Sequence, residues 1–106
     1  GPKDHPLLQG LDLPPLGIAS RPTPLVTKTL LFMGEGSNVH GGTMPLMIGR
    51  EFRAYDKATG EVLWETELPA ATTGGPMTYL VDGKQYIVVP IGERDRPAEW
   101  VALALR

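Results

Sequence analysis

The sequence contains no cysteine, which excludes disulfide bonds, thiolate metal ligands and cysteine nucleophiles. It also has no run of about 18 apolar residues, the length that a membrane-spanning helix requires, so no membrane span is predicted. Positive charge is not in excess, because the formal net charge is −2 at pH 7. Binding to nucleic acid through phosphate contacts needs clustered Lys and Arg, and we therefore expect no nucleic-acid partner.

Long segments free of both glycine and proline are rare, because the 106 residues include 13 Gly and 11 Pro. A helix requires such segments, and the short ones present here are rich in β-branched and aromatic residues. Hydrophobic residues make up 42% and charged residues 21% of the chain, which is ordinary for a globular protein. The sequence therefore predicts an all-β fold with many turns.

Short apolar runs alternate with turn residues from Leu25 onward, which is the pattern of consecutive antiparallel strands. The pair Asp82-Gly83 between two such runs is the strongest hairpin signal in the chain. A tight turn is also expected at residues 57–60, which end in glycine. Seven strands are predicted, at residues 25–27, 29–33, 51–56, 61–68, 77–81, 85–89 and 99–105.

The connections between these strands differ in length, with three long ones at residues 34–49, 69–76 and 90–98. In an up-and-down antiparallel series, all three emerge at one end, where loops on a rigid scaffold often carry functional groups. Four strands followed by three more, in units of about 50 residues, predict part of a β-propeller, about two blades.

The predicted organisation has three parts. Proline-rich residues 1–24 form an extended connector, because proline fixes φ and removes a backbone donor. Residues 25–68 form a complete four-stranded antiparallel blade, and residues 69–106 form an incomplete last blade that lacks its fourth strand. The last blade would expose a sheet edge unless another segment pairs with it.

A family resemblance begins at residues 53–64, where the chain reads Ala-x-Asp-x-x-Thr-Gly-x-x-x-Trp from Ala54 to Trp64. This resembles the blade motif that recurs around the eight-bladed propeller of quinoprotein dehydrogenases, which use pyrroloquinoline quinone (PQQ). The resemblance continues through residues 68–70, 76–79 and 82–89 and covers most of residues 22–105. Residues 24–32 resemble the membrane glucose dehydrogenase branch of the family.

The resemblance implies that the chain is the C-terminal segment of a periplasmic PQQ-dependent dehydrogenase that oxidises a glucose-like sugar or an alcohol. Electrons would pass to a quinone or a cytochrome, and PQQ would lie on the propeller axis with a calcium ion. The calcium ligands and the catalytic base would come from upstream blades, so no catalytic or metal-binding residue is assigned here. Gly92 matches a loop that comes near the quinone, and it is assigned as cofactor-binding.

The blade motif itself has a structural interpretation. Strand alternation predicts that Trp64 lies between blades. One face of the strand is expected to carry Val62, Trp64, Thr66 and Leu68, and the other Leu63, Glu65 and Glu67. The side chains of Asp56 and Thr59 are expected to bond backbone amides in the turn at residues 57–60.

Other candidate residues have ordinary alternatives. His40 could be a base, a metal ligand or a hydrogen-bond donor, but a solvated loop histidine is the simpler interpretation. His5 lies in the connector, and we expect no function for it. Glu35 and residues 92–96 could bind a cation or an alcohol, although alternating acids and bases more often pair with one another. Residues 72–76 lack the Lys and the strand-to-helix setting of a phosphate loop.

Two further hypotheses remain open at this stage. The chain could belong to a non-enzymatic propeller scaffold that acts through protein contacts, since outer-membrane assembly scaffolds share the Asp-to-Trp repeat. The partner of the open sheet edge could be the rest of a longer propeller chain or a second copy of this one. If the chain is instead part of a PQQ-dependent dehydrogenase, the isolated 106 residues would have no dehydrogenase activity, because one wall of a ring cannot enclose a cofactor.

Overall fold

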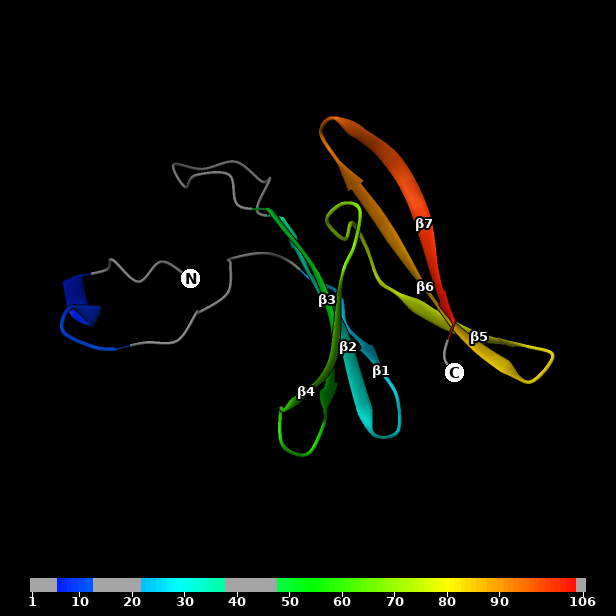
Figure 1. Ribbon diagram of the computed structural model, residues 1–106, viewed down its shortest axis with the longest axis horizontal. Helices are drawn as coiled ribbons and strands as arrows, with labels where there is room; N and C mark the ends of the chain where they lie inside the picture. The colour runs from blue at the N-terminus through cyan, green and yellow to red at the C-terminus, as the bar shows by residue number, and fades with distance from the viewer. Residues whose placement is uncertain (1–5, 13–21, 38–47, 105–106) are drawn as a thin grey trace.

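The computed structural model describes residues 6–12, 22–37 and 48–104, and these form an antiparallel all-β structure, as the sequence predicts. A single 3₁₀ turn, η1 (Pro6–Leu8), precedes the strands (Figure 1). The strands are β1 (Leu25–Val26), β2 (Leu30–Ser37), β3 (Ile48–Asp56), β4 (Val62–Glu67), β5 (Met77–Val81), β6 (Lys84–Glu93) and β7 (Arg96–Ala104).

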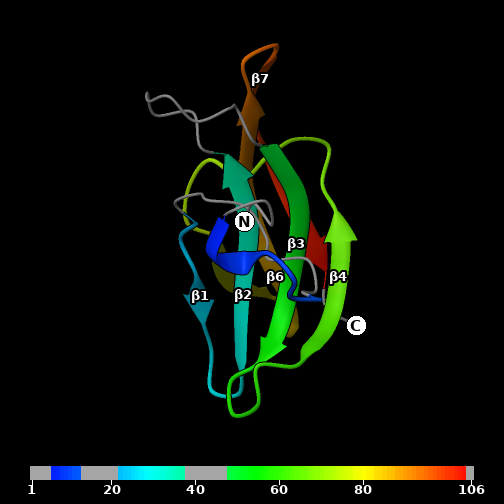
Figure 2. The ribbon, with the colours of Figure 1, turned by 90° about the vertical axis from the view of Figure 1, so that its left-hand side faces the viewer.

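The strands form two antiparallel sheets in sequence order. The first sheet has the order β1-β2-β3-β4 and the second has the order β5-β6-β7. The β1–β2 and β3–β4 turns lie together at the lower end of the first sheet in Figure 2. The amide of Lys57 donates a hydrogen bond of 3.1 Å to the carbonyl of Thr29, which joins these two turns.

The two predicted tight turns are confirmed. Asp82 and Gly83 have φ values of 50° and 74°, the left-handed pair that a two-residue hairpin between twisted strands requires. In the β3–β4 turn, Gly60 has a φ of 77°. Both turns therefore follow from the local sequence alone.

The predicted long loop at residues 90–98 is wrong. β6 continues to Glu93 and β7 begins at Arg96, so only two residues connect them. Pro90 fits inside β6 although it has no N–H, because its N–H would not have pointed toward β7. In a strand, the N–H and C=O of one residue point to the same side. The Pro90 carbonyl accepts from the Thr73 amide, on the side away from β7, so no hydrogen bond to β7 is lost. The loop predicted at residues 34–49 is likewise partly strand, since β2 reaches Ser37 and β3 begins at Ile48.

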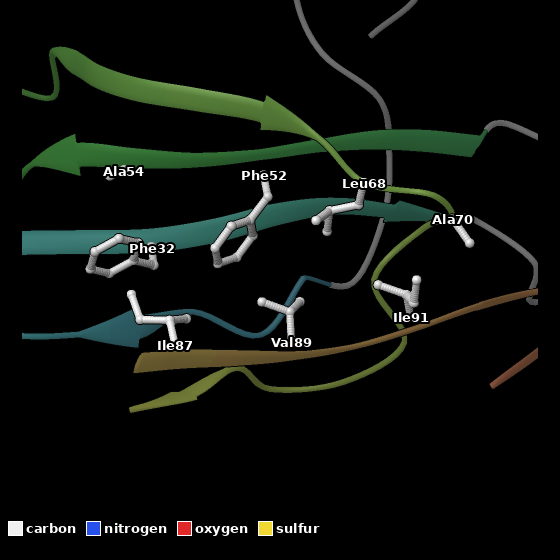
Figure 3. Close-up of a cluster of buried hydrophobic side chains, with 8 residues drawn as sticks. All are labelled: Phe32, Phe52, Ala54, Leu68, Ala70, Ile87, Val89 and Ile91. Carbon is white, nitrogen blue, oxygen red and sulfur yellow. The ribbon is translucent and has the colours of Figure 1, made fainter. Parts of the chain in front are cut away.

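The core lies between the two sheets. Side chains of β2 and β3 point toward β6, as Figure 3 shows. The rings of Phe32 and Phe52 are stacked with centroids 6.2 Å apart, and Trp64 meets Phe52 edge-on at 6.4 Å. The buried cluster comprises Phe32, Phe52, Ala54, Leu68, Ala70, Ile87, Val89 and Ile91.

β4 departs from the alternation that the sequence predicts. The register pairs Ala54 with Trp64 but Tyr55 with Val62, so Leu63 is an extra residue in a β-bulge. Val62 therefore lies on the opposite face from Trp64, and Leu63 lines the same intersheet cavity as Trp64, both contrary to the prediction. Trp64 does face the second sheet, although 44% of its surface remains exposed.

The connection between the sheets is hydrogen-bonded to the second sheet. Thr72 forms an isolated antiparallel bridge with Ile91. The amide of Thr73 donates to Pro90 at 3.0 Å, and the amide of Gly92 donates to Ala71 at 3.0 Å. Residues 71–73 thus pair with residues 90–92 of β6, along the same edge of β6 where β5 pairs with residues 84–88.

The division into a connector at residues 1–24, a blade at 25–68 and an incomplete blade at 69–106 stays a prediction, and much of the connector lies outside the described residues. Across the part of the chain that the structure describes, no helix is long and apolar enough to cross a membrane.

Candidate functional site

Three residues with charged side chains lie at the end of the sheets where β2 ends, β3 begins and β6 turns into β7. Glu35 lies near the end of β2, Arg50 near the start of β3, and Glu93 at the end of β6. The residue-68-to-76 connection passes the same end (Figure 1). Most of the sequence-predicted candidates are therefore brought to one end of the structure.

Glu35 is an ion-pair partner inside the first sheet. Its carboxylate accepts a hydrogen bond of 2.9 Å from Arg53, and Arg53 also binds Glu65 of β4 at 3.0 Å. The side chain of Glu35 crosses the space beside Gly49, where a Cβ would overlap it. Glu35 is thus occupied by neighbouring groups and is not a free loop carboxylate.

Glu93 joins the two sheets through Arg50. The guanidinium donates from Nε to Oε1 at 2.6 Å and from Nη2 to Oε2 at 2.8 Å, which is a bidentate arrangement. The amide of Ala71 donates to the same carboxylate at 3.2 Å. These hydrogen bonds, that from Arg50 first, hold the pKa of Glu93 below its ordinary value. Only 15% of the Glu93 side chain is exposed.

Gly92, the residue assigned to the cofactor, lies in a β-bulge between Ile91 and Glu93. A Cβ there would approach Thr73 at 3.3 Å and the backbone of Ala98 at 3.5 Å. The small residue therefore permits close packing of backbone in this chain, and its assignment to a cofactor stays a prediction.

Arg96 and Glu99 form an ion pair of 3.4 Å within β7, in keeping with a self-paired stretch. His40 and His5 lie outside the described residues. Among the residues that are described, no three side chains of His, Asp or Glu come together closely enough to hold a metal ion.

Asp56 and Thr59 perform the turn-forming task that the sequence predicts. Asp56 accepts hydrogen bonds from the amides of Ala58 at 2.8 Å and Thr59 at 3.0 Å, and the Thr59 hydroxyl accepts from Glu61 at 3.2 Å. The bonds from Thr59 and Ala58 hold the pKa of Asp56 below its ordinary value.

Arg50 was not among the residues predicted from the sequence. Its partner Glu93 is 43 residues away, and neither residue belongs to a short motif. The available signal was the repeat itself, which places β3 of one sheet against β6 of the next.

An apolar cavity of about 450 Å³ also lies between the sheets, on the side of their outer strands β4 and β7. It is lined by Leu30, Phe32, Ala54, Leu63, Trp64, Ile87, Leu103 and Ala104. The cavity has no charged side chain in its lining, so it suits apolar groups.

The blade motif, the paired sheets and the intersheet packing agree with the comparison to known proteins. The family model for the β-propeller domain of glucose, ethanol and alcohol dehydrogenases (PQQ) matches residues 2–87. The chain belongs to this family. The expected family resemblance is thereby confirmed.

Several relatives of the chain carry dehydrogenase names. The chain is 34% identical over 89 residues to the quinate/shikimate dehydrogenase (quinone) of Acinetobacter baylyi, covering 74% of this chain and 11% of that protein. It is 52% identical over 40 residues to the quinoprotein glucose dehydrogenase of Escherichia coli, covering 38% and 5%. It is 39% identical over 66 residues to subunit 1 of the methanol dehydrogenase (cytochrome c) of Paracoccus denitrificans, covering 55% and 10%.

The chain thus spans about a tenth of the length of such relatives. No solved structure matches it significantly.

The described residues do not by themselves fit PQQ, a planar quinone that carries several carboxylates. The intersheet cavity offers apolar groups only. The polar depression beside β3 is lined by three acids, Glu35, Glu51 and Glu67, and its one cation, Arg50, is already bound to Glu93. A complete quinone site would therefore require groups from outside these residues.

Proposed function

We propose that the chain forms part of the β-propeller wall of a PQQ-dependent dehydrogenase that oxidises a glucose-like sugar or an alcohol. The single observation that carries this proposal is the family match over residues 2–87. The names of the relatives, which include glucose, methanol and quinate dehydrogenases, support the enzyme over the scaffold alternative.

The parent protein, in this proposal, holds PQQ and calcium, works in the periplasm and passes electrons to a quinone or a cytochrome. The bound quinone supplies two-electron redox chemistry. Catalytic and calcium-binding groups come from other parts of the propeller, and the only contact proposed for this chain is the backbone at Gly92. Its partners are the rest of the propeller and the small substrate.

The contribution of this chain is a rigid wall. The core between the sheets and the Arg50–Glu93 pair hold two neighbouring sheets in a fixed relation. A cofactor site needs such rigidity, because groups from several elements must keep a common geometry. The isolated chain is therefore proposed to be inactive.

The proposal is tested by paired dye-reduction assays with glucose and simple alcohols, in the presence of PQQ and calcium. The chain alone should give only the blank rate, whereas the complete polypeptide from the same reading frame should turn over. An inactive complete polypeptide that also fails to bind PQQ would contradict the proposed function, and turnover by the chain alone would contradict its role as a wall.

A further inference from the structure

The pairing between β6 and the connection that joins the sheets is altered at Gly92. Thr72 forms an antiparallel bridge with Ile91, so Ala71 faces Gly92. Two residues that face each other in this way ordinarily exchange both of their N–H···O=C bonds. The amide of Gly92 does donate to the carbonyl of Ala71, at 3.0 Å. The returning donor, the amide of Ala71, bonds the side chain of Glu93 instead, at 3.2 Å.

This diversion leaves the carbonyl of Gly92 available as an acceptor. Within a strand, the N–H and C=O of one residue point to the same side, and the amide of Gly92 points toward Ala71 and away from β7. Gly92 is only partly buried, and the hairpin residues after Glu93 are exposed. A group that approaches this end of the sheets therefore meets a backbone oxygen whose usual partner is bonded elsewhere.

The diversion is held in place from the first sheet. Arg50 of β3 donates to both oxygens of the Glu93 carboxylate, at 2.6 Å and 2.8 Å. One of these oxygens, Oε1, also accepts from the amide of Ala71. Because a bidentate contact fixes the plane of a carboxylate, Arg50 sets the position from which Glu93 reaches Ala71.

The chemistry of this end favours a ligand that donates a hydrogen bond. A carbonyl oxygen is an acceptor only, so it pairs with a hydroxyl or an N–H and not with a carboxylate. Arg50 is already bound to Glu93, and the two residues of the hairpin turn, Arg94 and Asp95, carry opposite charges. The polar depression on the other side of Arg50 is lined by the acids Glu35, Glu51 and Glu67.

We propose that the carbonyl of Gly92 accepts a hydrogen bond from a hydroxyl of the sugar or alcohol substrate, and that Glu93 and Arg50 are positioning residues that keep this carbonyl available. The inference rests on the proposed function, which brings a substrate to Gly92. It assigns the chain a part in specificity. Neutral hydroxyl compounds are favoured over an acid anion such as quinate, for which one relative is named.

Substitutions of Glu93 in the complete polypeptide from the same reading frame test this inference. Glu93→Ala removes the acceptor, so the amide of Ala71 is released to bond the carbonyl of Gly92 and occupy it. Glu93→Gln keeps a side-chain oxygen, although a weaker acceptor, and serves as the conservative variant. Arg50→Lys keeps the charge but loses the bidentate contact. The control is Glu99→Gln, which breaks an exposed ion pair within β7.

KM and kcat are measured with glucose and simple alcohols, and the dissociation constant of PQQ is measured by titrating the cofactor-free polypeptide. Glu93→Ala should raise KM roughly 3–10-fold and leave kcat and the PQQ dissociation constant nearly unchanged, because the substrate loses a hydrogen bond that it makes before and during the reaction alike. Glu93→Gln and Arg50→Lys should raise KM by smaller factors, and Glu99→Gln should leave it unchanged.

The other outcomes overturn the inference in different ways. An unchanged KM in Glu93→Ala would show that the carbonyl of Gly92 does not meet the substrate. Weaker PQQ binding with an unchanged KM would assign the carbonyl to the cofactor, and faster turnover of quinate than of glucose and simple alcohols would contradict the preference for neutral substrates. Each of these results leaves the dehydrogenase function standing, whereas a complete polypeptide that neither turns over nor binds PQQ would remove that function and this inference together.

Discussion

Two glycines are needed for space, because side chains from distant segments cross over them. A Cβ at Gly34 would overlap the side chain of Thr72, and one at Gly49 would overlap that of Glu35. Neither glycine has a positive φ in the structure, so backbone conformation does not explain them. Gly34 in particular lets the connection between the sheets lie directly against β2.

Gly34→Ala should therefore destabilise the chain by about 1–3 kcal/mol, the usual cost of overpacking a tight contact. The matched control is Gly74→Ala, whose Cβ would meet only Pro90, at 3.4 Å. That control should change stability by about 0.5 kcal/mol or less. Urea unfolding measures both, and equal losses for the two variants would show that the Gly34–Thr72 contact is not tight.

Asp56 should make stability depend on acid pH. Because its pKa is lower in the folded chain than its ordinary value of 3.8, its stabilisation is present at neutral pH and is lost as the pH falls through the folded pKa. Asp56→Asn, which keeps an acceptor but cannot ionise, should flatten the fall in the urea midpoint between about pH 5 and about pH 2. An unchanged slope would mean that the turn does not favour the ionised form.

At the scale of strands and turns, most of the fold could be predicted from the sequence. The Asp82-Gly83 hairpin, the turn at Gly60 and the order of the seven strands depend on local residue types, and the structure confirms them, although β2, β3, β6 and β7 extend into residues predicted as loops. The β6–β7 hairpin could not be predicted, because Pro90 and Gly92 ordinarily interrupt strands. They are accommodated only by residues 71–73, which pair with the other side of β6.

The site was less predictable than the strands. Sequence placed Glu35 and Glu93 at the correct end of the sheets, but it left their partners open. The partners Arg53 and Arg50 depend on register within a sheet and on packing between sheets, respectively. The bulge at Leu63 was missed because strict alternation describes an undistorted strand only.

Loss of the Arg50–Glu93 pair should loosen the contact between the sheets. Glu93→Gln should lower the urea midpoint and speed hydrogen exchange at the amide of Ala71, which donates to Glu93. It should also flatten the loss of stability below about pH 5, since the Glu93 pKa lies below its ordinary value of 4.5 in the folded chain. The control, Glu99→Gln, breaks an exposed pair within β7 and should have little effect. Unchanged exchange at Ala71 would contradict the role of Glu93.

At the scale of the whole molecule, the chain depends on one apolar layer between its sheets. Phe52 is fully buried and contacts the rings of both Phe32 and Trp64. Small domains have a free energy of unfolding of about 5–15 kcal/mol, so a large loss in this layer removes much of the total.

Phe52→Ala should thus cost about 3–5 kcal/mol and leave much of the chain unfolded at moderate temperature. Val81→Ala, at a position of β5 that is 47% exposed, provides the control and should cost much less. Circular dichroism during heating measures both. A small loss for Phe52→Ala would indicate that the sheets are stable separately.

The hydrogen bonds of residues 71–73 have a consequence for limited digestion. A protease must draw several residues of extended, unpaired backbone into its cleft, and the link between two sheets is ordinarily where it succeeds. Here that link is hydrogen-bonded to β6 through Ala71 and Thr73, on either side of the Thr72–Ile91 bridge, so both sheets should survive together as one resistant fragment.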